Sequence, residues 1–214
     1  MMPGITRLRE PARRDETCGG YDQLHTDLVM QMTADRFAAA PDFTAFLSQI
    51  RENAEMWPAV YRTARVPEEL VARGRDIPGD WKLVALVEDW CGDAVNVIPV
   101  LEKLVEQLPN FELKLMGRDA NPDLMDAHLT DGTARAIPVV IVYNAAFEEV
   151  GWWGPRPAAL QRWFKTDGQL LEKGERYKQS RMWYARDRGR STLEEILGIA
   201  EVAANGLRIP SVIH

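Results

Sequence analysis

A cysteine in the middle of the chain, Cys91, is the residue best placed to do chemistry. It follows Trp90 and precedes Gly92 and Asp93. The apolar run at residues 83–87 predicts a buried strand before this motif. Apolar spacing after the motif predicts a helix whose buried face includes Ile98, Leu101, Val105 and Leu108. A strand, a short turn and a helix would place Cys91 at the helix N-terminus, where backbone N–H groups stabilise the reactive thiolate.

The segment around Cys91 resembles the active-site segment of the thioredoxin family. Residues 90–92 match the first three residues of its Trp-Cys-Gly-Pro-Cys motif, and Pro99 matches the proline that kinks the family's active-site helix. Pro138, which stands 47 residues after Cys91, matches the cis-proline that faces the family's active cysteine. The resemblance therefore implies a cis bond between Ile137 and Pro138.

The same segment departs from the family's pattern at the positions that resolve a mixed disulfide. Asp93 and Ala94 stand where the family has proline and the second cysteine, which makes the chain similar to the branch with a Trp-Cys-Gly-Asp-Ala or Trp-Cys-Gly-Asp-Cys motif. The family also keeps a buried acid six residues before the first cysteine, and that position here is Ala85. Both changes concern the resolving step. The resemblance thus implies a thiol at Cys91 that attacks but has no second cysteine in reach.

The order of elements around the motif predicts the fold class. Strand and helix signals follow one another as βαβαββα from residue 83 to about residue 171, which is the order of the thioredoxin core. The chain is therefore expected to be an α/β protein with a thioredoxin-like three-layer fold, an N-terminal helical extension and an added C-terminal helix. The expected strands after the Cys91 helix are residues 111–116, 136–143 and 147–153.

Four segments are expected along the chain. They are a loose tail (1–20), an N-terminal helical extension (21–80), the thioredoxin-like core (81–172), and a basic stretch followed by a C-terminal helix (173–214). In the extension, one apolar stripe predicts a single helix from residue 43 to residue 57, capped by Asp42 and kinked or ended by Pro58. A capping box at residues 191–194 predicts the start of the last helix.

Composition limits the classes of function. The 214 residues carry a net charge of −6, which gives no general reason to bind nucleic acid or membranes. The stretch 173–190 is locally basic and holds three aromatic residues. We expect it to be a solvated linker or the solvated face of a helix; the alternative is a surface that stacks nucleic-acid bases. No run is long enough to span a bilayer, and two cysteines are too few for a disulfide scaffold, so the cytoplasm is the expected location. No phosphate loop, paired-cysteine zinc site or nucleophile elbow occurs, so no metal or cofactor is expected, and His128 supplies no catalytic base by any recognisable spacing.

Three functions fit these observations. In the first, a monothiol redox protein, the Cys91 thiolate attacks a disulfide or oxidised thiol of a protein or a low-molecular-weight partner, and an external thiol resolves the adduct. The alternative is a non-catalytic binding module that holds an extended peptide at the surface of Trp90 and Pro138, a mode that the family implies. A glutathione-type transferase or peroxidase ranks last, since no glutathione-binding motif occurs. Cys18, in the tail, is either a resolving thiol or a bystander.

The site residues carry expectations that a structure can test. If the helix dipole outweighs the carboxylate of Asp93, Cys91 should be exposed and its pKa should lie below about 8.5. If the helix dipole does not outweigh that carboxylate, Cys91 is expected to be an inert, half-buried cysteine. The site should be lined by Trp90, Gly92, Asp93, Ala94, Ile137 and Pro138. Trp90, Trp152 and Trp153 are expected to be packing residues rather than a ligand platform.

Overall fold

The structure, a computed structural model, describes residues 32–207. The expected tail with Cys18 and the first helical signal after it lie outside the described residues. Within residues 32–207, the element order after residue 80 is βαβαββα followed by two further helices, so the predicted core order is confirmed. Among these residues, no helix is long and apolar enough to cross a membrane.

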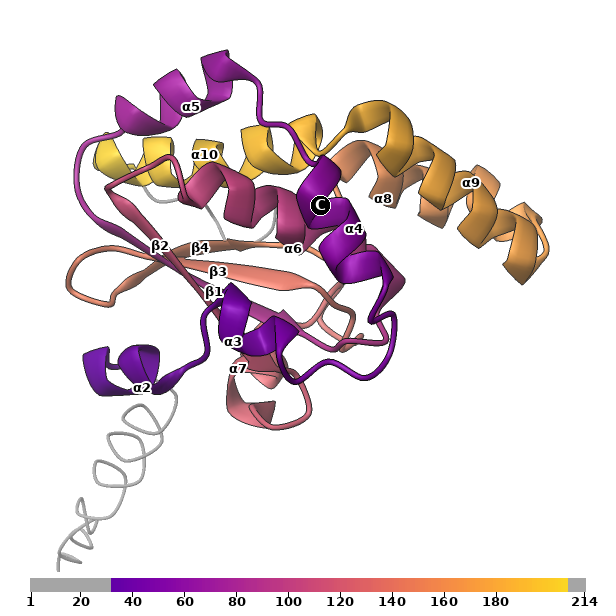
Figure 1. Ribbon diagram of the computed structural model, residues 1–214, viewed down its shortest axis with the longest axis horizontal. Coiled ribbons are helices and arrows are strands. Elements are labelled where there is room, and N and C mark those ends of the chain that lie inside the picture. The colour runs from indigo at the N-terminus through magenta and orange to yellow at the C-terminus, as the bar shows by residue number, and fades with distance from the viewer. Residues whose placement is uncertain (1–31, 208–214) are drawn as a thin grey trace, which may run out of the picture. The chain divides into compact units, whose positions relative to one another are not determined.

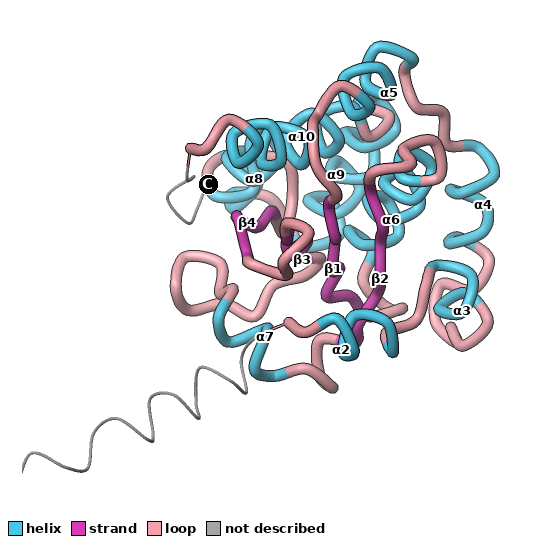
Figure 2. The backbone as a smooth tube through the Cα atoms, turned by 90° about the vertical axis from the view of Figure 1, so that its left-hand side faces the viewer, coloured by secondary structure: helices cyan, strands magenta, loops and turns pink. Residues whose placement is uncertain are grey.

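A four-stranded mixed sheet forms the centre of the fold (Figures 1 and 2). The strands are β1 (Trp81–Val87), β2 (Phe111–Gly117), β3 (Val139–Tyr143) and β4 (Glu149–Trp153), in the spatial order β2-β1-β3-β4. β1 runs parallel to β2 and antiparallel to β3, and β3 runs antiparallel to β4. The two central strands, β1 and β3, are almost entirely buried. Their continuous apolar sequences suit strands that are covered on both faces.

Helices cover both faces of the sheet. Figure 1 shows α6 (Gly92–Val105) and α10 (Arg190–Ala204) over one face, and α2 (Ala34–Ala39), α3 (Phe43–Leu47) and α7 (Pro122–Ala127) on the other side. α10 packs against β3, β4, α6 and α5 (Glu68–Arg75), and α6 packs against α4 (Met56–Thr63) and β2. α8 (Ala158–Lys165) follows β4. Helices on both faces make this a three-layer α/β fold.

The apolar stripe at residues 43–57 forms two helices, so the prediction of one continuous helix is wrong. α3 ends at Leu47 and α4 begins at Met56. Between them the backbone N–H groups of Arg51 and Glu52 donate to a carboxylate, and Asn53 has a φ of 51°. Those N–H groups are therefore not used in a helix. Pro58 lies in the first turn of α4, where a missing N–H costs no helical hydrogen bond, and so it does not end the helix.

The basic stretch is helical. α9 (Lys173–Asp187) follows a short 3-10 turn (Asp167–Leu170) and is separated from α10 by Arg188 and Gly189, whose φ angles are +55° and +81°. The predicted capping box does not form. α10 begins two residues earlier, at Arg190 with Gly189 as its N-cap, and the hydroxyl of Ser191 donates to Asp187 while Glu194 pairs with Arg190. The Ser191 hydroxyl is therefore bonded to Asp187 and does not cap the helix.

Candidate functional site

The structure brings Cys91, Ala94, Ile137 and Pro138 together at the N-terminus of α6. Cys91 is the N-cap of this helix, and its Sγ accepts a hydrogen bond from the Ala94 N–H at 3.5 Å. The thiol lies 3.4 Å from the carbonyl oxygen of Ile137, to which it can donate. The Ile137–Pro138 peptide bond is cis, which is the isomer the sequence predicts. The loop before β3 and the start of α6 thus meet at the sulfur.

Cys91 is buried, which contradicts the expectation of an exposed, acidic thiol. It is 7% exposed. The pKa of the thiol is raised from 9.0 to about 11, mainly by burial; the Ala94 N–H opposes this rise and the nearby Asp93 carboxylate adds to it. The helix terminus does act on the sulfur as the sequence suggests. Its effect is outweighed because loss of solvent disfavours the thiolate more strongly.

Asp93 is a buried acid with two partners from distant parts of the chain. It is 8% exposed, Arg156 Nη2 lies 2.6 Å from its carboxylate, and the Tyr184 hydroxyl donates to it at 3.1 Å. Burial raises the pKa of Asp93, and the Arg156 guanidinium opposes that shift. A buried carboxylate needs such partners. The sequence signals neither of them, since Arg156 lies in the loop before α8 and Tyr184 lies in the basic stretch.

The resolving half of a dithiol site is missing in space as well as in sequence. Ala94 and Ala85 are both fully buried, in α6 and β1 respectively. Within residues 32–207, Cys91 is the sole cysteine, and it is free. Among the described residues, position 94 therefore supplies no second thiol and position 85 supplies no buried acid of the kind that the family uses.

Trp90 is exposed, so the expectation that it is a packing residue is wrong. It is 44% exposed, whereas Trp152 and Trp153 are buried as expected. The guanidinium of Arg118 lies 5.0 Å from the centre of the Trp90 ring and donates to the carbonyl of Arg135, just before Ile137. Arg118 thereby links the indole to the segment that contains the cis-proline.

Asp89 fixes the loop that carries Trp90 and Cys91. Its carboxylate accepts the N–H groups of Arg51 and Glu52 at 2.7 and 3.0 Å, and these backbone donors hold the pKa of Asp89 below its usual range. Its carbonyl accepts from Asn53 Nδ2 and Trp57 Nε1, each at 3.0 Å. The N-terminal extension thus positions the candidate site. The sequence signals none of these four partners, since each lies more than 30 residues before Asp89.

A hollow of about 330 Å³ opens beside the exposed Trp90. It lies between the start of α6, the start of α4 and the middle of α9. Its lining combines apolar, aromatic and polar side chains: Asn53, Met56, Trp90, Gly92, Asp93, Asn96, Tyr177, Ser180, Arg181 and Tyr184. Of the predicted site-lining residues, Trp90, Gly92 and Asp93 face this hollow, while Ala94, Ile137 and Pro138 are buried.

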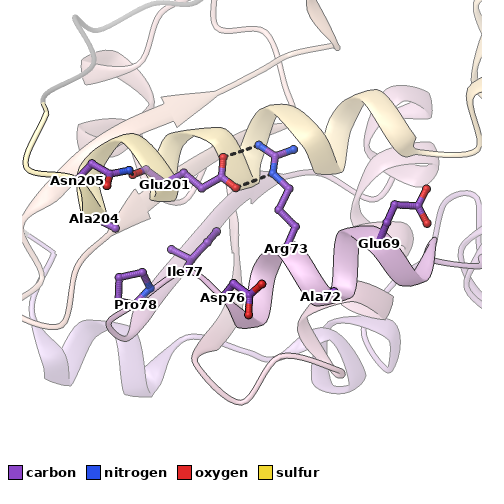
Figure 3. Close-up of a pocket in the computed structure, with 9 residues that line it drawn as sticks. All are labelled: Glu69, Ala72, Arg73, Asp76, Ile77, Pro78, Glu201, Ala204 and Asn205. Carbon is purple, nitrogen blue, oxygen red and sulfur yellow. Dashed lines mark hydrogen bonds and ion pairs between the residues drawn. The ribbon is translucent and has the colours of Figure 1, made fainter.

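Two other features of the described chain lie apart from this site. A hollow of about 560 Å³ lies between α5 and α10, where Arg73 and Glu201 form a bidentate ion pair between the two helices (Figure 3). His128 is buried, with Nδ1 2.6 Å from the Leu124 carbonyl and Nε2 3.1 Å from Glu149. Neither imidazole nitrogen bonds to Cys91. Among residues 32–207, no cluster of three or more potential metal ligands occurs.

Comparison with known proteins agrees with this fold. The sequence model of a family described as Thioredoxin matches residues 40–172. Solved structures with a similar fold include a protein of unknown function from Pseudomonas aeruginosa, 21% identical, with a TM-score of 0.65 over 80% of this chain and 99% of that one. They also include an HIV epitope scaffold, 21% identical, with a TM-score of 0.61 over 78% of this chain and 96% of that one. Among curated proteins no significant relative was found.

Proposed function

The chain belongs to the thioredoxin family, and on that premise we propose that it is a non-catalytic binding module that holds an extended polypeptide segment beside Trp90 and Ile137. The observation that carries this proposal is a backbone donor without a partner. Among the described residues no acceptor receives the Ile137 N–H, although Ile137 is only 6% exposed. Buried backbone N–H groups are nearly always paired. An N–H left open in the segment that Arg118 links to the exposed Trp90 indole suits a polypeptide segment that adds as a strand.

The state of the thiol supports binding over catalysis. A pKa of about 11 leaves about one thiolate in ten thousand molecules near pH 7. The protonated thiol can donate to the Ile137 carbonyl, so Cys91 supports the loop before β3 from within rather than acting as a nucleophile, and a serine hydroxyl could do the same. Ala94 and Ala85 agree with this role, because a binding site needs neither a resolving cysteine nor a proton-transferring acid.

An unfolded model protein whose cysteines have been carboxymethylated tests the proposal, because it offers extended backbone and no thiol or disulfide. Nitrogen-15 NMR should show shifts at the Ile137 amide and the Trp90 indole, while the buried Trp57 indole, bonded to Asp89, serves as the control. Trp90→Ala should weaken binding several-fold, and Cys91→Ser should leave it unchanged. Loss of binding in Cys91→Ser, or no shift at Ile137, would contradict the proposal.

Monothiol redox chemistry is the second candidate, and the position of the sulfur favours it. Cys91 retains the N-cap place of an attacking thiol, beside the cis-proline. In this reaction the Cys91 thiolate attacks one sulfur of a disulfide, a new S–S bond forms, and the other sulfur leaves as a thiolate. An external thiol then attacks the mixed disulfide and releases Cys91.

Oxidised glutathione separates the two candidates. If Cys91 is reactive, intact-mass analysis at neutral pH should find one glutathione adduct at Cys91, and Ala94→Cys should convert that adduct into an internal disulfide. If the site only binds, the wild-type protein should stay unmodified under conditions that modify a model thiol. A disulfide between Cys18 and Cys91 would instead show that the tail supplies a resolving thiol.

A further inference from the structure

The hollow beside Trp90 continues into a second one. The second hollow, of about 400 Å³, lies between α4, α6 and the end of α9, and it shares Asn96 and Tyr184 with the first. We call the two together the α4–α9 groove. Its second half is lined by Val60, Thr63, Ala64, Arg65, Asn96, Val100, Tyr184, Ala185, Arg188 and Gly189.

The groove follows the helix axes. Its floor is one face of α6, formed by Gly92, Asn96 and Val100 at a spacing of four residues. Each wall repeats that spacing, through Met56, Val60 and Ala64 on the α4 side and through Tyr177, Arg181 and Ala185 on the α9 side. Eight residues of helix rise about 12 Å, which is the length of about four extended residues. The groove therefore fits a short stretch of extended chain.

The charge of the lining indicates the partner. Arg65, Arg181 and Arg188 line the groove and are exposed. Within the described chain, neither Arg181 nor Arg188 pairs with a carboxylate. The one acid among the lining residues is Asp93, whose charge is already matched by Arg156. The groove thus presents unmatched positive charge, although the chain as a whole carries a net charge of −6.

We propose that the α4–α9 groove binds an acidic segment of a partner polypeptide, with an apolar side chain of that segment lying against Met56, Val60 and Val100. This deepens the proposed function and rests on it, since the same segment would pass Trp90. α9 lies beyond the 40–172 span of the family match, so one wall of the groove is an addition to the matched core. The addition would select which polypeptide the site holds.

Two labelled six-residue peptides test the charge requirement. One has a central leucine with glutamates on both sides, and the other has glutamines in place of the glutamates. Fluorescence anisotropy should show the glutamate peptide binding at least fivefold more tightly, with the difference shrinking as salt is added. Equal binding of both peptides would overturn the proposal.

Charge reversal on α9 tests the location. Arg181→Glu should weaken binding of the glutamate peptide by roughly fivefold, since an exposed ion pair is lost and a repulsion added. Arg186→Glu is the matched control, because Arg186 lies on the same helix and is exposed but does not line the groove. It should change affinity by less than about twofold. Equal losses in both variants would mean that only the general charge of α9 matters, which would contradict the proposal.

A variant that fills the groove gives an independent test. Ala185 is exposed and lines the groove, so Ala185→Trp should block peptide binding without disturbing the core. Binding that survives Ala185→Trp would overturn the proposal. So would self-association of the chain that Arg181→Glu abolishes, or tighter binding of a deoxythymidine oligomer at this site. If the carboxymethylated protein still shifts Ile137 while the glutamate peptide fails to bind, the proposed function stands and this inference alone fails.

Discussion

The ionisation of Cys91 is decided by the competition between two local effects. The N-terminus of α6 supplies a hydrogen bond from the Ala94 N–H, which favours the thiolate, while burial and the Asp93 carboxylate favour the neutral thiol. Burial has the largest effect because little solvent reaches the sulfur. The same motif on a more exposed loop would give the opposite result.

The rate at which iodoacetamide modifies Cys91 should therefore keep rising with pH beyond pH 9 and level off near pH 11, because the raised pKa delays formation of the thiolate. Asp93→Asn should move that curve to lower pH, since it removes a neighbouring negative charge. The measurement is intact-mass kinetics in a Cys18→Ser background, so that only Cys91 is counted. A plateau below about pH 8.5 would contradict the burial argument.

Removing Arg156 should leave the Asp93 carboxylate buried with only Tyr184 as a partner. We expect Arg156→Met to lower the free energy of unfolding by about 3–5 kcal/mol, the usual cost of breaking a buried ion pair. Because the loss of Arg156 raises the folded-state pKa of Asp93 further, this destabilisation should ease as the pH falls and the carboxylate takes up a proton.

Denaturant titration of four proteins checks this expectation: the wild type, each single variant and the double variant with Asp93→Asn. The double variant should recover most of the lost stability, because an amide is less costly to bury than an unpaired charge. If Arg156→Met alone is as stable as the wild type, Asp93 has another partner or is already neutral.

The loop between α3 and α4 connects the N-terminal extension to the candidate site. Asp89 at the end of β1 receives four hydrogen bonds from that loop and from α4, two at its carboxylate and two at its carbonyl. This arrangement interrupts the stripe at residues 43–57 and holds Trp90 at the surface. The extension is therefore part of the site and more than a packing surface.

Asp89→Ala removes the two carboxylate bonds while leaving the two at the carbonyl. We expect a loss of about 1 kcal/mol in unfolding free energy, since the side chain is only partly buried, together with much faster hydrogen exchange at the amides of Arg51 and Glu52. Asp42→Ala is the matched control, because it removes the cap of α3 and leaves the Asp89 bonds intact. Unchanged exchange at both amides would show that Asp89 does not hold the loop.

α10 belongs to the core of the whole molecule even though it follows the span of the family match. Its buried side chains pack against β3, β4, α5 and α6: Leu193, Ile196, Leu197, Ile199 and Ala200. Burying four large aliphatic side chains contributes roughly 6–12 kcal/mol, which is comparable to the stability of an entire domain. The segment of residues 40–172 should therefore not fold stably without α10.

A chain that ends at residue 172 should lose cooperative thermal unfolding and expose apolar surface. Circular dichroism melting and binding of a hydrophobic dye measure both effects. A chain that ends at Leu207 is the control, because it keeps α10 complete. A cooperative transition at the wild-type temperature in the shorter chain would contradict the assignment of α10 to the core.

Local sequence pattern was sufficient to predict those features of this protein that depend on residues close together in the chain. The apolar runs predicted the strands, the spacing after Cys91 predicted α6, and the motif predicted that Cys91 begins a helix. The match of Pro138 to the family predicted a cis bond after Ile137, whose carbonyl oxygen lies 3.4 Å from the sulfur. Each of these follows from periodicity or from a residue type at a fixed offset.

Tertiary structure decided the properties that depend on burial and on pairs of residues far apart in the chain. Asp93 meets Arg156 and Tyr184, and Asp89 meets Arg51 and Glu52, across separations that no local pattern reports. Whether a helix-terminal thiol is acidic depends on how much solvent reaches it. The access of solvent to the thiol is set by every element packed around it. A sequence motif that predicts a reactive cysteine therefore contains, in this fold, a buried cysteine whose raised pKa favours the protonated thiol.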